Sequence, residues 1–333
     1  MSLFLGIDGG GTKSDFLLID ALGKVLAAHR EGSAYYPQIG VEALRAMLER
    51  GIRATLMQAS VPAAEVAFTC IGLPAYGEDS ALIGCLDEIA SGILPRQRYA
   101  CVNDMVCGWA AALACRDGIN IVAGTGSIGY GEFESRRARG GGWGELFSDE
   151  GSAYWIAREG LTLFSRMSDG RADRAPLLDL MRGHFRLRTD LDVCAAVYGP
   201  PPMTRSEIAA LAPIVARAAR AGDMPALRIF EMAAAELAAI VHAVRDKLAV
   251  PPLLPLPVSY SGGMFQADSL LTPLLEQALR RSGRHYAFAA PKASPRAGAA
   301  LYAAKLGGEP LTLQAVAQLT RTHGADLLED VHS

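Results

Sequence analysis

Hydrophobic and polar residues along the first 60 positions form blocks that predict three strands followed by a helix. Residues 3–8 are an apolar run, a glycine-rich stretch follows, and residues 14–20 are a second apolar run. Two short apolar runs joined by glycines predict a hairpin, and a third strand is expected at 24–30. Apolar residues at helical spacing between 41 and 59 then predict a helix.

The alternation of strands and helices continues to about residue 115. The patterns predict a strand at 66–73, a helix across 79–92, a strand at 99–103 and a helix from Asp104 to about Cys115. Strands and helices that follow one another in this way are typical of α/β proteins. We therefore expect an α/β fold.

The hairpin plan then recurs at residues 120–142, NIVAGTGSIGYGEFESRRARGGG. Two hairpins of the same plan, about one domain apart, indicate a duplicated domain. A chain of 333 residues is also long for one hydrophobic core. We expect an N-terminal domain at 1–116 and a larger C-terminal domain at 117–333 with a helical insertion, and the last helices could pack back on the first domain.

The second half of the chain is expected to be mainly helical. Apolar residues at helical spacing over 227–248 predict a long amphipathic helix of about seven turns. A strand is expected at 258–263, helices at 268–282 and 295–306, and a surface helix within 311–333.

The composition is that of an ordinary globular protein, with half of the residues hydrophobic, a fifth charged and a net charge of −3. It provides no basic face for nucleic acid. No apolar run reaches the roughly 20 residues of a membrane helix, and the N-terminus lacks the pattern of a secretory signal. The six cysteines form no CxxC pair and most lie in apolar runs, so we expect reduced thiols and a cytoplasmic location.

The two glycine-rich turns do not fit the two common nucleotide-binding loops. Thr12 separates Gly11 from Lys13, which excludes the P-loop spacing. Residues 124–129 match GxGxxG, but a strand pattern follows where a dinucleotide-binding fold needs a helix. What remains is a hairpin tip whose glycines can adopt positive φ and direct backbone N–H groups at a phosphate. A plain glycine turn is the alternative for either hairpin alone.

Three short motifs stand out in the chain, DGGGTKS at 8–14, GTGS at 124–127 and SGG at 261–263. Together they resemble the phosphate and adenosine motifs of the sugar kinase, actin and heat-shock chaperone ATPase superfamily. GGWG at 141–144 followed by DEGSAYWI at 149–156 is similar to the N-acetylglucosamine kinase branch of the BadF/BadG/BcrA/BcrD ATPase family. The resemblance spans about residues 3–305. It implies two duplicated ribonuclease H-like domains of the actin and hexokinase type, with a nucleotide and sugar cleft between them.

The resemblance also implies roles for individual residues. Asp104 would be the catalytic base and Asp8 the residue that holds Mg²⁺, although either could instead be a turn or helix cap. A tryptophan such as Trp143 is more often part of a core than a ligand platform. The residues implied for ATP are Gly10, Gly11, Thr12, Lys13, Thr125, Gly126, Ser127, Gly262 and Gly263, and those for the sugar are Gly142, Trp143, Asp149 and Tyr36.

The activity implied is ATP-dependent phosphorylation of the C6 hydroxyl of an amino-sugar, with N-acetylglucosamine first. Two stretches depart from that branch, because 32–37 (GSAYYP) lacks its sugar-contacting asparagine and 72–77 (GLPAYG) lacks its serine-rich form. A glucosamine or other hexose kinase therefore stays open. An ATPase activator of a 2-hydroxyacyl-CoA dehydratase would need thiolates for a shared iron–sulfur cluster, and a sugar-responsive regulator would need a DNA-binding helix-turn-helix. A homodimer is the default expectation.

Overall fold

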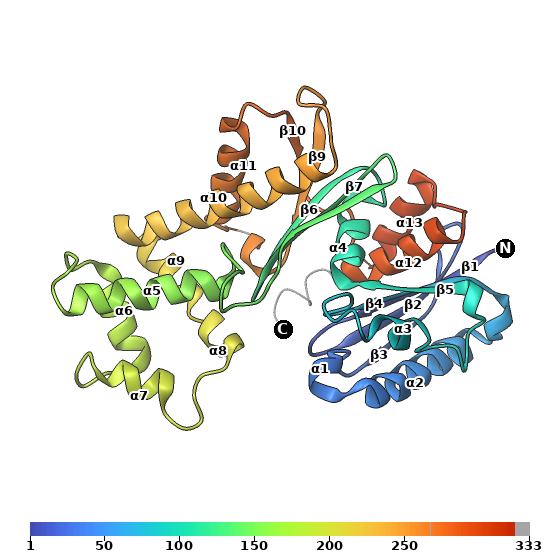
Figure 1. Cartoon of the computed structure of the whole chain (residues 1–333), viewed down its shortest axis with the longest axis horizontal. Coiled ribbons are helices and arrows are strands. Elements are labelled where there is room, and N and C mark those ends of the chain that lie inside the picture. Colours follow the sequence, from blue (N-terminus) through green and yellow to red (C-terminus); the bar gives the residue numbers. More distant parts are fainter. Residues whose placement is uncertain (267, 324–333) are drawn as a thin grey trace. The chain divides into compact units, whose positions relative to one another are not determined.

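The computed structural model describes residues 1–266 and 268–323, and the chain divides into two compact units. Unit 1 consists of Met1–Asn120 together with the described residues from Ala289 on, and unit 2 consists of Ile121–Phe288 (Figure 1). The last helices therefore belong by their contacts to the same compact unit as the N-terminal strands.

Unit 1 is built on a five-stranded sheet in the order β3-β2-β1-β4-β5. The β1–β2 and β2–β3 pairs are antiparallel, whereas β4 and β5 run parallel to β1. All five strands fall where the apolar pattern predicts them, and their bounds are Leu3–Gly9 (β1), Ser14–Asp20 (β2), Val25–Glu31 (β3), Val66–Leu73 (β4) and Tyr99–Asn103 (β5).

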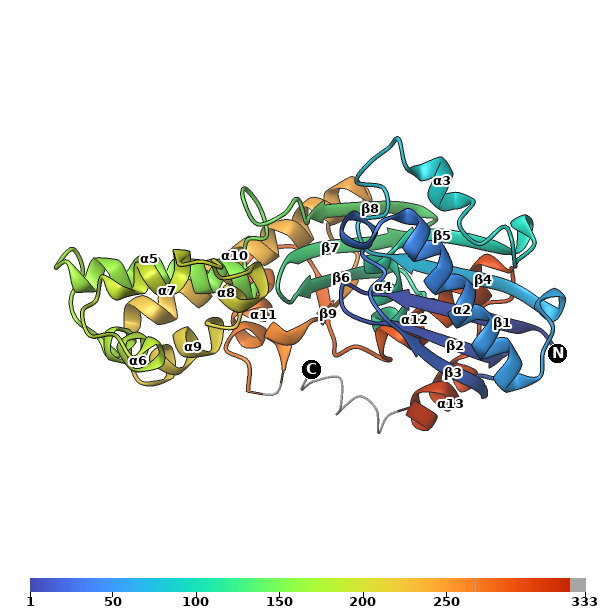
Figure 2. The same cartoon turned by 90° about the horizontal axis from the view of Figure 1, so that it is seen from below.

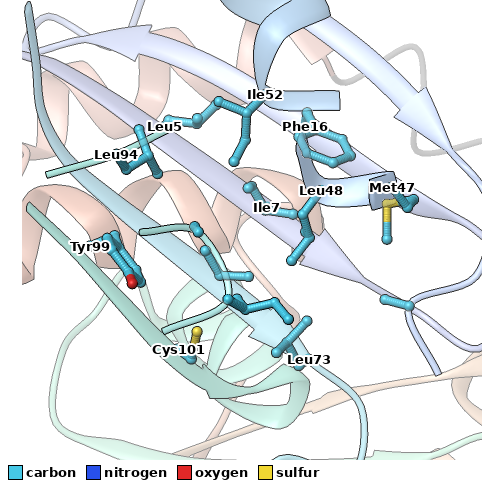
Figure 3. Packing of buried hydrophobic residues seen from close by; sticks show 14 of the residues in the cluster. Leu5, Ile7, Phe16, Met47, Leu48, Ile52, Leu73, Leu94, Tyr99 and Cys101 are labelled. Atoms are coloured by element: carbon cyan, nitrogen blue, oxygen red, sulfur yellow. The ribbon is translucent and has the colours of Figure 1, made fainter. Parts of the chain in front are cut away.

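Helices cover both faces of this sheet (Figure 2). Helix α2 (Val41–Ala59) packs on one face, and its buried residues Met47, Leu48 and Ile52 join the strands in one hydrophobic cluster (Figure 3). On the other face, α12 (Pro295–Leu306) packs against β1 and α4 (Asp104–Leu113). The shorter helices of the unit are α1 (Tyr36–Ile39), α3 (Ile83–Asp87) and α13 (Leu313–His323), with single 3₁₀ turns at Ala63–Glu65 and Arg96–Arg98.

Two helix predictions need comment. The continuous helix expected across 79–92 is wrong, because α3 covers only five residues and turns with i to i+3 hydrogen bonds flank it. Gly84 and Gly92 weaken a helix at this place. The surface helix expected within 311–333 corresponds to α13, which buries Ala315 and Leu319; residues 324–333 lie outside the described residues.

Unit 2 repeats the strand plan of unit 1. Its sheet has the order β10-β9-β6-β7-β8, so in both sheets the first strand is central, the second and third follow on one side, and the fourth and fifth follow on the other. This shared order confirms the expected duplication. The strands are β6 (Gly118–Ala123), β7 (Ser127–Phe133), β8 (Arg136–Gly141), β9 (Leu256–Ser261) and β10 (Tyr286–Phe288).

A helical segment is inserted in unit 2 between β8 and β9 (Figure 1). The predicted long amphipathic helix is α10, whose 24 residues bury Phe230, Leu237 and Val241 against the sheet and neighbouring helices. None of the helices in the described part of the chain is long and apolar enough to cross a membrane. The helices of unit 2 are α5 (Ala153–Ser168), α6 (Pro176–Phe185), α7 (Asp192–Tyr198), α8 (Arg205–Ala209), α9 (Ala212–Arg220), α10 (Met224–Lys247) and α11 (Leu271–Arg281), with a 3₁₀ turn at Gly263–Phe265.

Candidate functional site

In unit 1, two aspartates reach the same edge of the sheet. Asp8 of β1 is the register partner of Gly72 on β4, and Gly72 is the partner of Val102 on β5. Asp104 follows β5 directly. Because neighbouring strands lie about 4.8 Å apart, the backbones of Asp8 and Val102 are roughly 10 Å apart, and Asp104 comes two residues after Val102. The carboxyl ends of parallel strands are where α/β proteins place reacting groups.

The thiol of Cys107 lies close to both carboxylates. Its hydrogen bond with Cys70 and its complete burial raise the pKa of Cys107 well above the usual value, and the negative charges of Asp8 and Asp104 raise it further. The three groups therefore lie together on the α4 side of the sheet. Thiols of the core strands and α4 are buried as expected, but Cys85 and Cys194 are exposed.

Asn103, and not Asp104, caps helix α4. Its side-chain Oδ1 accepts a hydrogen bond from the Met105 backbone N–H at 3.2 Å, and its Nδ2 donates to the Tyr76 carbonyl at 3.1 Å. Asp104 is the first residue of the helix and is half-buried. The helix-cap alternative for Asp104 is therefore wrong, and its carboxylate stands in the first turn, where the helix dipole favours negative charge.

Asp15 is a second carboxylate beside Asp8 that the sequence pattern did not single out. The two residues are directly opposite each other in the β1–β2 pair, so their side chains share one face of the sheet. Asp15 is buried and accepts a hydrogen bond from Arg30 Nε at 2.7 Å, with Arg296 of α12 at 4.0 Å. These arginines balance the negative charge at this edge.

The first glycine loop, residues 10–13, closes with a hydrogen bond from the Gly10 N–H to the Lys13 carbonyl at 2.9 Å. Gly11 and Thr12 are exposed. Gly10, Gly11 and Gly124 do not use the positive φ that glycine permits. A methyl group on Gly11 or on Gly124 would meet no atom of the described residues within 4 Å. Internal packing therefore gives no reason for glycine at either position.

The second glycine loop, residues 124–127, joins β6 to β7 in unit 2 and is hydrogen-bonded to residues at the start of α5 and just before it. The Gly124 carbonyl accepts a hydrogen bond from the Ala153 N–H, at the start of α5, at 2.8 Å. Ser127 is buried, and its hydroxyl donates to the Glu150 carbonyl at 2.7 Å. Thr125 is exposed at the tip. The hydroxyl of Ser127 is thus an internal anchor of the loop.

Asp149 packs against this second loop, next to Gly126 and Ser127. Its Oδ1 accepts a hydrogen bond from the Ser127 N–H at 3.2 Å, and Arg205 donates to its Oδ2. Asp149 is only 2% exposed, and burial is the main reason that its pKa is raised, while the Ser127 N–H and the charge of Arg205 act in the opposite direction. A methyl on Gly126 would lie 3.0 Å from both carboxylate oxygens, so glycine is needed there.

The loop before Asp149 presents apolar side chains to the surface. Trp143 is 69% exposed and the Arg139 guanidinium lies 5.6 Å from the centre of its ring. Gly142 has a φ of 71°, and its carbonyl accepts a hydrogen bond from Arg139 at 2.7 Å. The core alternative for Trp143 is therefore wrong. Leu146 and Phe147 of the same loop are exposed as well.

Two further predicted positions have clear surroundings. Gly262 has a φ of 99°, and a methyl there would meet the Ala123 carbonyl oxygen at 2.5 Å and the Gly124 nitrogen at 3.0 Å. The turn of Gly262 and Gly263 therefore packs against the second glycine loop. Tyr36, in contrast, is buried in the core of unit 1 and donates its hydroxyl to the Ala75 carbonyl at 2.8 Å; burial raises its pKa.

The donor groups fit a magnesium ion that is bound mainly through a nucleotide. Among residues 1–266 and 268–323, no three His, Cys, Asp or Glu side chains form a ready ligand group. Mg²⁺ usually takes one or two carboxylates together with phosphate oxygens and water. Asp8, with Asp15 opposite it and the first glycine loop after it, supplies a donor set of that kind.

The model of the BadF/BadG/BcrA/BcrD ATPase family matches residues 5–303. The chain belongs to this family. An N-acetyl-D-glucosamine kinase of Dictyostelium discoideum is 25% identical to this family member over 90% of the chain and 97% of its own length. An N-acetylmuramic acid/N-acetylglucosamine kinase of Clostridium acetobutylicum is 30% identical over 75% of the chain and 81% of its own length.

Solved structures agree with this membership. A proposed N-acetylglucosamine kinase of Chromobacterium violaceum is similar with a TM-score of 0.66 and 26% identity, over 91% of this chain and 99% of that one. A ROK hexokinase of Thermus thermophilus, at 17% identity and a TM-score of 0.54, shares the fold over 90% of this chain and 97% of its own. The expected family and the two-domain α/β fold of the sugar kinases are thereby confirmed.

In this chain, the predicted site residues form two groups, one in each unit. Asp8, Asp104 and the loop of residues 10–13 belong to unit 1. The loop of residues 124–127, Asp149 and Gly262 belong to unit 2. Sequence reasoning missed Asn103, Asp15 and Arg205. Arg205 is 56 residues from Asp149 in the chain, and no local pattern could have paired them.

Proposed function

We propose that the protein is an ATP-dependent N-acetylglucosamine kinase that transfers the γ-phosphate of ATP to the C6 hydroxyl of the sugar. The observation that carries the proposal is the position of Asp104, at the sheet edge that also holds Asp8 and leads into the first glycine loop. Family membership and two curated relatives that are named as N-acetylglucosamine kinases support the same activity.

The two glycine loops are proposed to bind the phosphates of ATP. Gly11 and Gly124 are glycines that neither backbone conformation nor internal packing explains. A phosphate group that approaches the backbone closely does explain them, because any side chain would stand in its way. We place the adenosine at Gly262 and Gly263, since that turn packs against the second loop.

Asp104 acts as the base in the proposed reaction. It accepts the proton of the C6 hydroxyl while the hydroxyl oxygen bonds to the γ-phosphorus and the bond from that phosphorus to the bridging oxygen of ADP breaks. Bound Mg²⁺, held by Asp8 in this proposal, supplies charge neutralisation on the phosphates. Asn103 fixes the start of α4 and so fixes the backbone from which the Asp104 side chain projects.

Asp149, Gly142 and Trp143 are proposed to bind the sugar. The carboxylate of Asp149 has further lone pairs besides those used by Ser127 and Arg205, and these can accept hydrogen bonds from ring hydroxyls. Trp143 offers an exposed apolar ring in the loop that precedes Asp149. Tyr36 is not included, because its hydroxyl is engaged with the Ala75 carbonyl inside unit 1.

The proposal includes ATP and Mg²⁺ as the phosphoryl donor and its metal, a cytoplasmic location, and a homodimer only as a general default. Glucosamine or another hexose remains the alternative acceptor, because residues 32–37 and 72–77 depart from the expected sugar-side motifs. The name of the Clostridium relative adds N-acetylmuramic acid to the sugars to be tried.

A panel assay of ADP release tests the function. Purified protein with ATP and Mg²⁺ is offered N-acetylglucosamine, glucosamine, glucose and N-acetylmuramic acid in turn, with Asp104→Asn as the blank. We expect sugar-dependent ADP release that is fastest with N-acetylglucosamine. Release that does not depend on any sugar would contradict a kinase, and a clear preference for another sugar would replace the acceptor.

A further inference from the structure

The side chain of Arg205 contacts two acidic residues of the loop that carries Asp149. Its Nη2 donates to Asp149 Oδ2, and its Nε lies 3.4 Å from Glu145 Oε2. The same guanidinium lies against Gly126 of the second glycine loop, since a methyl on that glycine would collide with it. Arg205 therefore connects the helical insertion of unit 2 both to the loop that carries Asp149 and to the second glycine loop.

The backbone at Arg205 is fixed independently of these contacts. Thr204 caps helix α8, with its hydroxyl accepting from the Glu207 N–H at 3.3 Å and its own N–H donating to the Glu207 carboxylate at 2.7 Å. Arg205 is the first residue of the helix and lies between the two residues of this capping box. The capped start of α8 is therefore a firm base for a long side chain that reaches Asp149.

Asp149 depends on such a partner because it is buried. A carboxylate removed from water is unfavourable unless hydrogen bonds and an opposite charge replace the lost hydration. The Ser127 N–H supplies one hydrogen bond, and Glu145 adds repulsion. Arg205 supplies the opposite charge and fixes the second carboxylate oxygen, so it determines how the carboxylate is turned.

We propose that Arg205 is a positioning residue for the sugar site: it holds the Asp149 carboxylate against the Ser127 N–H, in the one orientation that presents its remaining lone pairs to ring hydroxyls. Arg205 lies outside every motif that the family resemblance supplies. The inference rests on the proposed function, because it assigns Asp149 to the sugar.

The inference carries a pH dependence with a defined sign. The charged groups that face Asp149 are Arg205, which lowers its pKa, and Glu145, which raises it, while burial raises it most. Removal of Arg205 therefore raises the pKa of Asp149 further. The protonated carboxyl then appears at a higher pH, so the acid-side rise of the sugar KM should begin at a higher pH than in the unaltered protein.

The test compares Arg205→Ala and Arg205→Lys with a matched arginine of the same unit. Arg182 on α6 also bridges two acids, with Nε 2.7 Å from Asp190 Oδ1 and Nη1 3.1 Å from Asp179 Oδ1, and is similarly exposed. Arg182 is not among the residues proposed to bind ATP or the sugar. Sugar KM, ATP KM and kcat are measured for all variants between pH 5 and 9, with thermal unfolding as the check of folding.

For Arg205→Ala we expect a sugar KM at least about tenfold higher, since a hydrogen bond to a charged group is lost, with the ATP KM changed by less than about threefold. Arg205→Lys keeps the charge but cannot bridge both acids, so its sugar KM should lie between those of the unaltered protein and Arg205→Ala. Arg182→Ala should change the thermal unfolding but leave the sugar KM, the ATP KM and kcat unchanged. If Arg205→Ala fails to fold, Arg205→Lys tests the role alone, with a smaller rise of the sugar KM and an unchanged ATP KM as the expected result.

The positioning role is overturned if the sugar KM and its pH profile in the Arg205 variants match those of Arg182→Ala. It is overturned equally if the sugar and ATP KM values rise together. Failure of the proposed function looks different, because the unaltered protein would then phosphorylate none of the sugars.

Discussion

Asp8 at the end of β1 lies beside Gly72 of β4, whose missing side chain makes room for helix α4. A methyl on Gly72 would lie 2.5 Å from the Cys107 sulfur and 3.6 Å from the Cα of Asp104. Because glycine has no side chain, helix α4 can begin close to the sheet at this position. This contact is what brings Asp104 and Asp8 to one sheet edge.

Gly72→Ala should therefore damage both folding and turnover. We expect the free energy of unfolding to fall by about 1–3 kcal/mol, because the added methyl overlaps a short and fully buried side chain. Urea unfolding measures the loss. The double variant Gly72→Ala/Cys107→Ala removes the overlapping sulfur and should recover much of it. A double variant no more stable than Gly72→Ala would show that this contact is not the cause.

Gly124→Ala separates ligand binding from folding. A methyl there meets no atom of the described residues within 4 Å and φ is ordinary, so the free energy of unfolding should stay equal or rise by up to about 1 kcal/mol. The ATP KM should rise at least about tenfold, because the methyl stands where a phosphate is proposed to approach. Gly183→Ala on α6, equally open, is the control and should leave the ATP KM unchanged. An unchanged ATP KM in Gly124→Ala would argue against a phosphate at this loop.

Tyr36→Phe asks whether Tyr36 is a core residue or a sugar ligand. The hydroxyl is buried and donates to the Ala75 carbonyl, so its loss should lower the free energy of unfolding by about 1–3 kcal/mol. The sugar KM should stay the same. Tyr198→Phe, at a tyrosine that is 77% exposed, is the control for the substitution itself. A raised sugar KM with unchanged stability would return Tyr36 to the sugar site.

Asp8→Asn tests the proposed metal role. The amide keeps the size of the side chain but removes the negative charge that attracts a divalent cation. We expect the Mg²⁺ concentration at half-maximal rate to rise about tenfold or more, while unfolding changes little. Magnesium titrations at saturating ATP and sugar measure the shift. Equal magnesium dependence of the two proteins would place the metal elsewhere.

The sequence predicted the parts of the fold that local patterns control. Both glycine-tipped hairpins, α2 and α10 follow from apolar runs and helical spacing, and all of them form as expected. The segment 79–92 failed because its apolar spacing is helical, whereas Gly84 and Gly92 and the polar residues near Asp79 favour turns. Spacing alone does not show which of these tendencies prevails.

The candidate site was predictable only where a motif marks it. Asp8, Asp104 and the glycine loops lie in recognisable stretches, but the cap of α4 proved to be the neighbouring Asn103. Trp143 is exposed and Tyr36 is buried, and aromatic residues give no sequence signal that distinguishes these two fates. Arg205 could not be found, because its contact with Asp149 exists only after the helical insertion has folded.

The most direct test of the central claim identifies the phosphorylated product. Protein, ATP, Mg²⁺ and N-acetylglucosamine are incubated, and the products are analysed by phosphorus–proton correlation NMR, with Asp104→Asn in parallel. The account predicts a sugar phosphate whose phosphorus couples to the C6 protons. It predicts turnover in Asp104→Asn lower by a factor on the order of hundreds, with ATP binding nearly intact. Full activity of Asp104→Asn, or ADP formed without any sugar phosphate, would contradict it.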